Sequence, residues 1–156
     1  MIKTFTIAPV RKTLVVNATQ AHAFDVFTNR LDSWWPKGHS IGALPVKQSF
    51  IEPRKGGRWY TTHDDGSECV VGHMKVWEPP HRIVFSWEIS ADWKPDPTVA
   101  SEVEIIFVAQ DARTTRVELE HRNFEALGEK GGEKVRGGVE GGWSGLLEIF
   151  RKQAEV

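Results

Sequence analysis

The sequence is poor in several residues that mark specialised classes of protein. It contains one cysteine, Cys69, which excludes an internal disulfide framework. No stretch approaches the roughly 18 consecutive apolar residues that a membrane-spanning helix requires. The 20 basic and 21 acidic residues leave a formal net charge of -1, so we expect neither nucleic acid nor a membrane surface as a partner. Residues 1–12 lack the apolar core of a secretion signal, and we therefore expect a cytoplasmic protein.

Large aromatic side chains are frequent by contrast, with seven tryptophans and eight phenylalanines against one tyrosine and two methionines. The length of 156 residues suits one domain, and no repeat, linker or low-complexity tract divides it. We therefore expect a single domain over residues 1–156. Such a domain must place its aromatic side chains in the core or in the wall of a pocket.

The first part of the sequence predicts a strand, two short helices and the start of a sheet. Residues 10–17 alternate between apolar and polar side chains, as strands do. Thr19 is a suitable N-cap for a helix that runs through Thr28, and a second short helix is predicted over residues 30–35. Between residues 46 and 122, turn signals separate five or six strands with no helix of useful length, which predicts an antiparallel meander.

The clearest hairpin of this meander turns at Asp65-Gly66, a pair suited to a two-residue turn. Its register places Trp59 opposite Gly72. Because side chains alternate along a strand, one face is predicted to carry Trp59, Thr61, Val70, Met74 and Val76, and the other Tyr60, Cys69, Val71, His73 and Trp77.

Apolar residues would interrupt the outer face of the sheet in this register, namely Tyr60, Val71, Trp77 and Val84. Exposed apolar clusters often mark a partner site, so we expect a homodimer that forms through this face. The last two strands leave that face charged. They direct Val103, Ile105, Phe107, Val117, Leu119 and His121 inward and Glu102, Glu104, Arg116, Glu118 and Glu120 toward water.

The C-terminal segment predicts a long amphipathic helix. At about 100° per residue its apolar side chains share one stripe, made of Val135, Val139, Trp143, Leu146, Leu147, Phe150 and Ala154. Eight of the 14 glycines lie between Gly128 and Gly145, and each costs about 1 kcal/mol relative to alanine inside a helix. Either the back of this helix needs close approach of another group, or residues 128–142 form a mobile flap over the sheet.

These elements together predict an α+β fold, in which a curved antiparallel sheet wraps around the long C-terminal helix and two short helices follow the first strand. One helix cannot cover a wide sheet, so the remaining volume is either filled by large side chains or kept open as an apolar cavity. The candidate ligand-binding residues on the walls of that cavity are Trp34, Trp35, Trp59, Val70, Phe85, Trp87, Phe107, Leu119, His121, Trp143 and Leu147.

Several short motifs, in this order along the chain, resemble the START-like superfamily. They are ATQ at 18–20 followed by AFDVFT, WWP at 34–36, GGRWY at 56–60, DG at 65–66 and then Gly72, EPPHRIVFSW at 78–87, LEHRNF at 119–124 and GGWSGLLEIF at 141–150. Within that superfamily the sequence is similar to the family related to the activator of the heat-shock-protein-90 ATPase. The resemblance implies a helix-grip fold, a bacterial-type cytosolic protein and a cavity between the sheet and the C-terminal helix. It implies no defined reaction.

Catalytic and metal chemistry find little support in the sequence. His63, Cys69 and His73 would be attractive zinc ligands, but His63 faces away from the other two. Cys69 and His73 lie four residues apart on one strand, which separates them by about 13 Å. We therefore expect no metal and no cofactor. No serine lies in a GxSxG motif, no GxGxxG follows a strand, and we name no catalytic residue.

His121 and three arginines, Arg30, Arg54 and Arg58, remain as polar groups that could contact a ligand. His121 is predicted to face inward, either as a core histidine bonded to a carbonyl or water, or as a group that orients a ligand. The arginines could pair with a ligand carboxylate, although solvated surface is the commoner fate of such side chains.

Two functions from different classes follow. The first is the binding of a small apolar or aromatic molecule in the cavity. The second is an enzyme of cyclase, dehydratase or hydrolase type that uses the same cavity with His121. Regulation of a chaperone ATPase is suggested by the family name alone, and we expect it less because the sequence shows no additional N-terminal domain.

Overall fold

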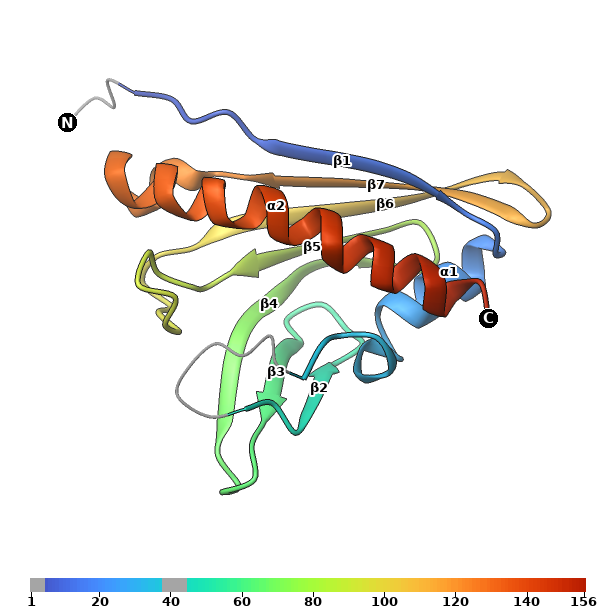
Figure 1. Ribbon diagram of the computed structural model, residues 1–156, viewed down its shortest axis with the longest axis horizontal. Coiled ribbons are helices and arrows are strands. Elements are labelled where there is room, and N and C mark those ends of the chain that lie inside the picture. The colour runs from blue at the N-terminus through green and yellow to red at the C-terminus, as the bar shows by residue number, and fades with distance from the viewer. Residues whose placement is uncertain (1–4, 38–44) are drawn as a thin grey trace.

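Seven antiparallel strands form one curved sheet that holds a long helix against its inner face (Figure 1). The computed structural model describes residues 5–37 and 45–156. In chain order the elements are β1 (Val10–Val16), α1 (Gln20–Phe27), the 3-10 turn η1 (Leu31–Ser33), β2 (Gln48–Ile51), β3 (Arg58–Thr62), β4 (Glu68–Glu78), β5 (Arg82–Trp87), β6 (Ser101–Asp111), β7 (Thr114–Arg122), the 3-10 turn η2 (Phe124–Leu127) and α2 (Glu129–Ala154). This is the α+β helix-grip arrangement that the sequence predicts.

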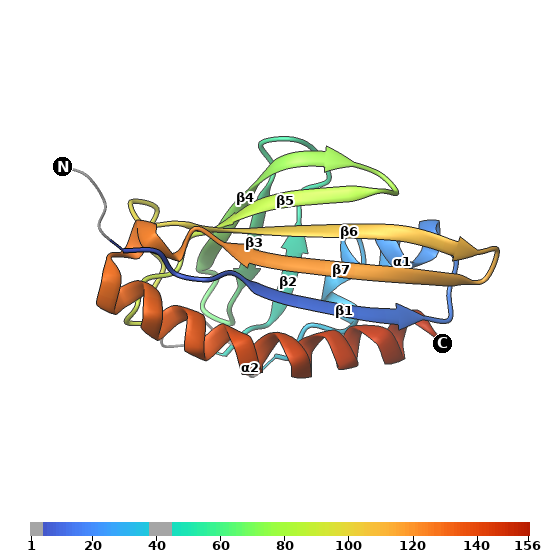
Figure 2. The same cartoon turned by 90° about the horizontal axis from the view of Figure 1, so that it is seen from above.

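The strand order is β1-β7-β6-β5-β4-β3-β2, so the first strand of the chain pairs with the last. Val10 lies opposite His121 and Val16 opposite Thr115. Seen from above, α2 runs along the β1 side of the sheet, while α1 lies toward the end of the sheet where β6 and β7 are joined (Figure 2). Within the described ranges, no helix is long and apolar enough to span a membrane.

The two helical segments after β1 follow from local signals. The Thr19 hydroxyl accepts a hydrogen bond from the His22 amide at 3.1 Å, which is the N-cap predicted for α1. The second predicted helix is reduced to the single turn η1. The chain leaves the helical conformation before Pro36, which disfavours that conformation in the residue ahead of it, and the Trp34 indole donates to the Val26 carbonyl at 3.0 Å in the core.

The hairpin of β3 and β4 contains a bulge that the sequence did not reveal. Trp59 lies opposite Gly72 as predicted, but the register shifts between Trp59 and Tyr60, which pairs with Val70. Val71 is the additional residue and is buried in the core, whereas Val70 is displaced to the outer side beside Tyr60. A shift of one residue reverses which face each side chain occupies. The prediction that Val70 lines the inner wall is therefore wrong.

Two register shifts alter the apolar surface from which a homodimer was expected. Val71 belongs to the core, and the Trp77 ring packs edge-on against Phe24 with centroids 5.3 Å apart. A second register shift between Met74 and Val76 brings Trp77 to that side. Two of the four residues thus lie inside, and Val84 is only 3% exposed. Val71 and Trp77 therefore do not contribute to the outer face, and the homodimer stays a prediction.

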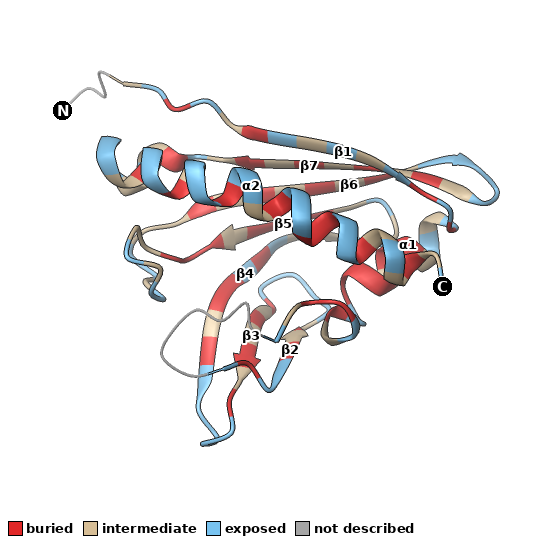
Figure 3. Ribbon diagram, viewed as in Figure 1, coloured by how far each residue is buried: buried red, intermediate tan, exposed pale blue. Residues whose placement is uncertain are grey.

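Helix α2 is continuous over 26 residues, and its predicted apolar stripe is buried throughout (Figure 3). Its glycines divide into two kinds. A methyl group on Gly132 would clash with the Phe124 carbonyl and Ile7, and one on Gly138 would lie 2.5 Å from the Trp93 ring. Methyl groups on Gly137 and Gly141 would meet nothing within 4 Å. Close approach of another group therefore explains Gly132 and Gly138, and it does not explain Gly137 and Gly141.

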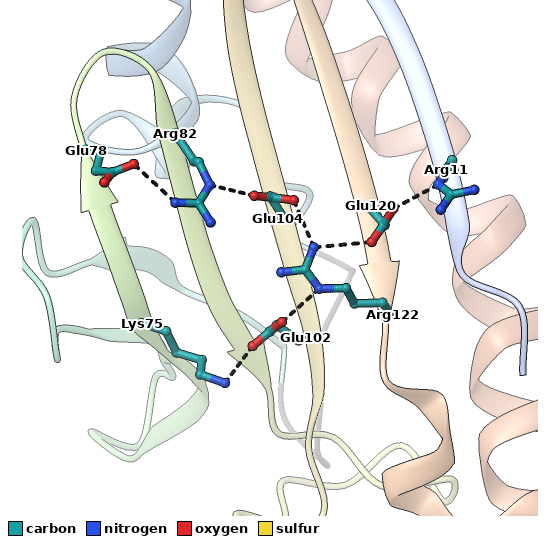
Figure 4. A network of polar contacts seen from close by, with 8 residues as sticks. All are labelled: Arg11, Lys75, Glu78, Arg82, Glu102, Glu104, Glu120 and Arg122. Carbon is teal, nitrogen blue, oxygen red and sulfur yellow. Dashed lines mark hydrogen bonds and ion pairs between the residues drawn. The ribbon is translucent and has the colours of Figure 1, made fainter. Parts of the chain in front are cut away.

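The outer face of the sheet carries a network of ion pairs that crosses five strands (Figure 4). Its members are Arg11, Lys75, Glu78, Arg82, Glu102, Glu104, Glu120 and Arg122. Arg122 is central, because it pairs with Glu102 and Glu104 at 2.8 Å each and with Glu120 at 3.2 Å. The last strands therefore have one charged face, as their alternation predicts.

Candidate functional site

Four tryptophans from four separate elements meet on the inner face of the sheet. They are Trp35 after η1, Trp59 on β3, Trp87 on β5 and Trp143 on α2, and we call them the tryptophan ring. Centroids lie 4.9 Å apart for Trp35 and Trp59, 6.0 Å for Trp59 and Trp87, 5.6 Å for Trp87 and Trp143, and 6.3 Å for Trp143 and Trp35. Each side chain contacts the next, so the four close into a circuit.

Regular geometry of the elements brings these residues together. Side chains along β3 and β5 alternate between the two faces of the sheet, and Trp59 and Trp87 occupy inward positions. Trp143 lies on the apolar stripe of α2. Gly72, which pairs with Trp59, lets the neighbouring strand β5 approach closely, because a methyl group there would overlap the Ser86 carbonyl. All four tryptophans are at most 5% exposed.

His121 lies against one side of the tryptophan ring and is held by two hydrogen bonds. The Trp143 indole donates to His121 Nδ1 at 3.0 Å, and His121 Nε2 lies 2.7 Å from Ser101 Oγ. An indole N–H can only donate, so Nδ1 is the acceptor and Nε2 carries the proton and donates to Ser101. The imidazole also stacks on Phe124, with centroids 4.7 Å apart.

Burial holds His121 in this neutral form. The residue is 0% exposed, and desolvation lowers its pKa from 6.5 to about 3. Both ring nitrogens are already occupied. The imidazole therefore orients Trp143 and is not placed to take a proton from a bound molecule.

The other predicted wall residues fall into two groups. Phe85 belongs with the tryptophan ring, because it contacts Trp59 at 4.9 Å between centroids. Trp34 and Phe107 lie toward α1, where both contact Phe27. Leu119 and Leu147 are buried in the same core. Ser101 and Phe124, both in contact with His121, were not predicted as site residues, because the alternation of the strands does not show which side chains bond to or stack on the imidazole.

Two indole N–H groups of the tryptophan ring have no hydrogen-bond partner. The buried polar atoms without one among the described residues are Trp59 Nε1, Trp87 Nε1, Ser49 Oγ and Thr62 Oγ1. Both hydroxyls lie on the short strands β2 and β3 and can rotate. The indole donors are fixed by the packing of their rings, so their directions are set by the fold.

Two surface hollows lie outside this cluster. One is on the outer face, where Arg11, Glu104 and Glu118 contribute to its lining. The other lies between β1 and α2 and includes Leu14, Ser144 and Leu147. Neither is lined by a member of the tryptophan ring.

The remaining polar candidates are engaged elsewhere. His63 Nδ1 lies 2.8 Å from the Pro45 carbonyl, whereas His73 pairs with Glu88 at 2.7 Å, so these two histidines do not converge. Each candidate arginine pairs with a carboxylate of its own chain, Arg30 with Asp25, Arg54 with Glu52, and Arg58 with Glu52 and Glu68. Within residues 5–37 and 45–156 no group of three potential metal ligands is found.

The fold is that of a START-like protein, a sheet that grips its C-terminal helix. A family model described as activator of Hsp90 ATPase homolog 1-like protein matches residues 17–155, and the chain belongs to this family. A search of curated protein sequences found no match.

Solved structures place the chain among several relatives. An anthrahydroquino-γ-pyrone synthase is 38% identical, with a TM-score of 0.60, and the match covers 84% of this chain and 86% of that one. CalC from Micromonospora echinospora, a self-sacrificing resistance protein, is 28% identical with a TM-score of 0.70, covering 94% and 93%. An HSP90 activator from Plasmodium falciparum is 18% identical with a TM-score of 0.51, covering 74% and 72%, and shares the fold.

Proposed function

We propose that this protein binds a small apolar or aromatic molecule between the sheet and α2, against the tryptophan ring. The observation that carries the proposal is the convergence of four tryptophans from four elements on one point of the inner face. Aromatic rings offer large, stiff, apolar contact surfaces, and ligand sites are lined mainly by such side chains.

The relatives support this class of ligand. The synthase that is 38% identical is named for an anthrahydroquino-γ-pyrone, which is a fused aromatic compound. The resistance protein and this chain share the same arrangement over nearly their full lengths. The family name alone would suggest chaperone regulation, but no contact described above favours it.

An enzyme that uses the same site is the second candidate, and the synthase among the relatives favours it. In that case His121 is a poor choice of acid or base. Its two nitrogens are bonded to Trp143 and Ser101, and burial lowers its pKa to about 3. Chemistry at this site would have to come from the bound molecule or from a group other than His121.

Native mass spectrometry of freshly purified protein, followed by extraction and identification of any bound molecule, tests the binding function. We expect a mass increment that organic extraction removes, and an apolar dye that binds the folded protein and is displaced by the extract. Trp87→Ala should abolish dye binding, because it opens the tryptophan ring, whereas Trp77→Phe, which alters a tryptophan outside the ring, should leave it unchanged. Dye binding that appears only when the protein unfolds would overturn the proposal.

A further inference from the structure

The two unpartnered indole N–H groups define what chemistry a molecule at the tryptophan ring must offer. Trp59 is 0% exposed and Trp87 is 4% exposed, and neither Nε1 atom has an acceptor. A buried donor without an acceptor costs about 1–3 kcal/mol, and native proteins retain few of them. Two such donors on rings in direct contact therefore require an explanation.

Two other indoles in this core donate to acceptors of the protein. Trp34 donates to the Val26 carbonyl at 3.0 Å, and Trp143 donates to His121 at 3.0 Å. The fold thus provides acceptors to buried indoles where the protein itself is the partner. Trp59 and Trp87 differ from them, and their rings meet edge-on, with an interplanar angle of 88°.

The aromatic neighbours of these two tryptophans do not supply the missing acceptors. The ring neighbours of Trp59 are Trp35, Phe85 and Trp87, none of which carries a strong acceptor. Trp87 contacts His121, but both nitrogens of that imidazole are occupied. An acceptor for either donor has to come from outside this group of side chains.

We propose, resting on the proposed function, that the ligand is a neutral aromatic carbonyl compound whose oxygen accepts hydrogen bonds from Trp59 and Trp87. A carbonyl oxygen has two lone pairs and can serve both donors. A carboxylate fits less well, because among the described residues the cation found over an aromatic ring, Arg58, lies over Tyr60 and not over these tryptophans, and a buried anion without a cation is strongly disfavoured. The carbonyl would set the orientation of a molecule that the aromatic rings hold by contact alone.

Two probes with one carbon frame test this proposal, 1-indanone, which has a carbonyl, and indane, which has none. Each is titrated into nitrogen-15-labelled protein, and the indole N–H resonances are assigned with single Trp→Phe variants. We expect 1-indanone to move the indole N–H proton resonances of Trp59 and Trp87 downfield, because each donates a hydrogen bond to the carbonyl. Indane has no acceptor and should cause no such downfield shift. We also expect 1-indanone to bind about 10-fold more tightly, as two net hydrogen bonds would give.

Variants separate the hydrogen bond from the loss of ring volume. Trp87→Phe and Trp59→Phe should each reduce the preference for 1-indanone by about threefold or more. Trp77→Phe is the control, since Trp77 lies outside the tryptophan ring and packs against Phe24, and it should retain the full preference. Equal affinity of the wild type for both probes would overturn the carbonyl assignment and leave the binding function standing. Failure of both probes to bind would count against the binding function itself.

Discussion

The fully buried imidazole of His121 makes the stability of this protein depend on pH. Desolvation lowers the pKa of His121 to about 3, against 6.5 for an exposed histidine. Between these values the unfolded chain binds a proton that the folded chain does not, so the free energy of unfolding falls as the pH falls. The contribution of the neutral imidazole is complete above about pH 6.5 and is lost progressively below it.

Replacing this histidine should remove that dependence. For the wild type we expect His121 alone to lower the free energy of unfolding by at most about 1.4 kcal/mol per pH unit below pH 6.5. His121→Gln should be less stable at pH 7, because Trp143 and Ser101 lose their partner, and its unfolding free energy should fall less steeply toward pH 5. Urea unfolding at several pH values measures both slopes. Parallel curves for the two proteins would show that His121 does not titrate in this way.

Sequence alternation was sufficient to place several single residues, but not to assign their partners. The period of two along β5 and β7 directs Trp87 and His121 inward, and both are buried. The bond from His121 to Ser101 joins residues on adjacent strands, so it depends on strand order. The unpaired state of the Trp59 and Trp87 donors depends on every neighbour at once and has no signature in the sequence.

Among the elements, α2 shows why a glycine-rich segment can still be a regular helix. Two of its glycines are required by contacts with Phe124 and Trp93, while others face solvent with open space around them. A solvent-facing glycine weakens a helix because it loses more backbone freedom on folding and contributes no side chain. The two explanations that the sequence left open therefore apply at different positions along one helix.

Adjacent glycines of α2 should respond to the same substitution in opposite directions. Gly137→Ala should raise the free energy of unfolding by up to about 1 kcal/mol, because nothing lies within 4 Å of the added methyl group. Gly138→Ala should lower it by about 1–3 kcal/mol, since the methyl group would lie 2.5 Å from the Trp93 ring. Thermal and urea unfolding of the two variants provide the measurement. If both substitutions stabilise, Trp93 can move aside and the contact is not a constraint.

The hairpin of β3 and β4 marks the limit of prediction at the level of elements. The pairing of Trp59 with Gly72 was correct, but the two-residue turn at Asp65-Gly66 was not, because the His63 amide bonds to the Ser67 carbonyl and Thr62 pairs with Glu68. The bulge after Trp59 was not predicted, because it adds one residue without altering the composition of either strand. That single residue exchanged Val70 and Val71 between faces, and a separate register shift after Met74 brought Trp77 to the inner side.

Across the whole molecule, the ion-pair network ties five neighbouring strands together on the outer face (Figure 4). Partial burial would raise the pKa of Glu102 and Glu104, but hydrogen bonds from Arg122 and from Lys75 or Arg82 outweigh it, and both pKa values are lowered. A carboxylate with a lowered pKa stabilises the folded state above its unfolded pKa of about 4.5, and this stabilisation is lost as the pH falls.

Loss of the central arginine should therefore cost more than loss of a peripheral one. Arg122→Gln leaves three glutamates close together and should lower the free energy of unfolding at pH 7 by about 1–2 kcal/mol, with a smaller deficit at pH 4. Arg116→Gln, which breaks one exposed pair with Glu118, should change it by less than about 0.5 kcal/mol. Chemical unfolding at both pH values compares them. Equal effects would mean that the network adds nothing beyond isolated pairs.

The pairing of β1 with β7 also determines when the sheet can be completed as the chain is synthesised. Val10 leaves the ribosome early, but its partner His121 follows only after the rest of the sheet has been made. Closing so long a loop costs entropy before the contact returns any stability, which slows folding in proteins of high contact order. Strand β1 therefore stays unpaired during translation, and we expect the sheet to be completed only once β7 and α2 have left the ribosome.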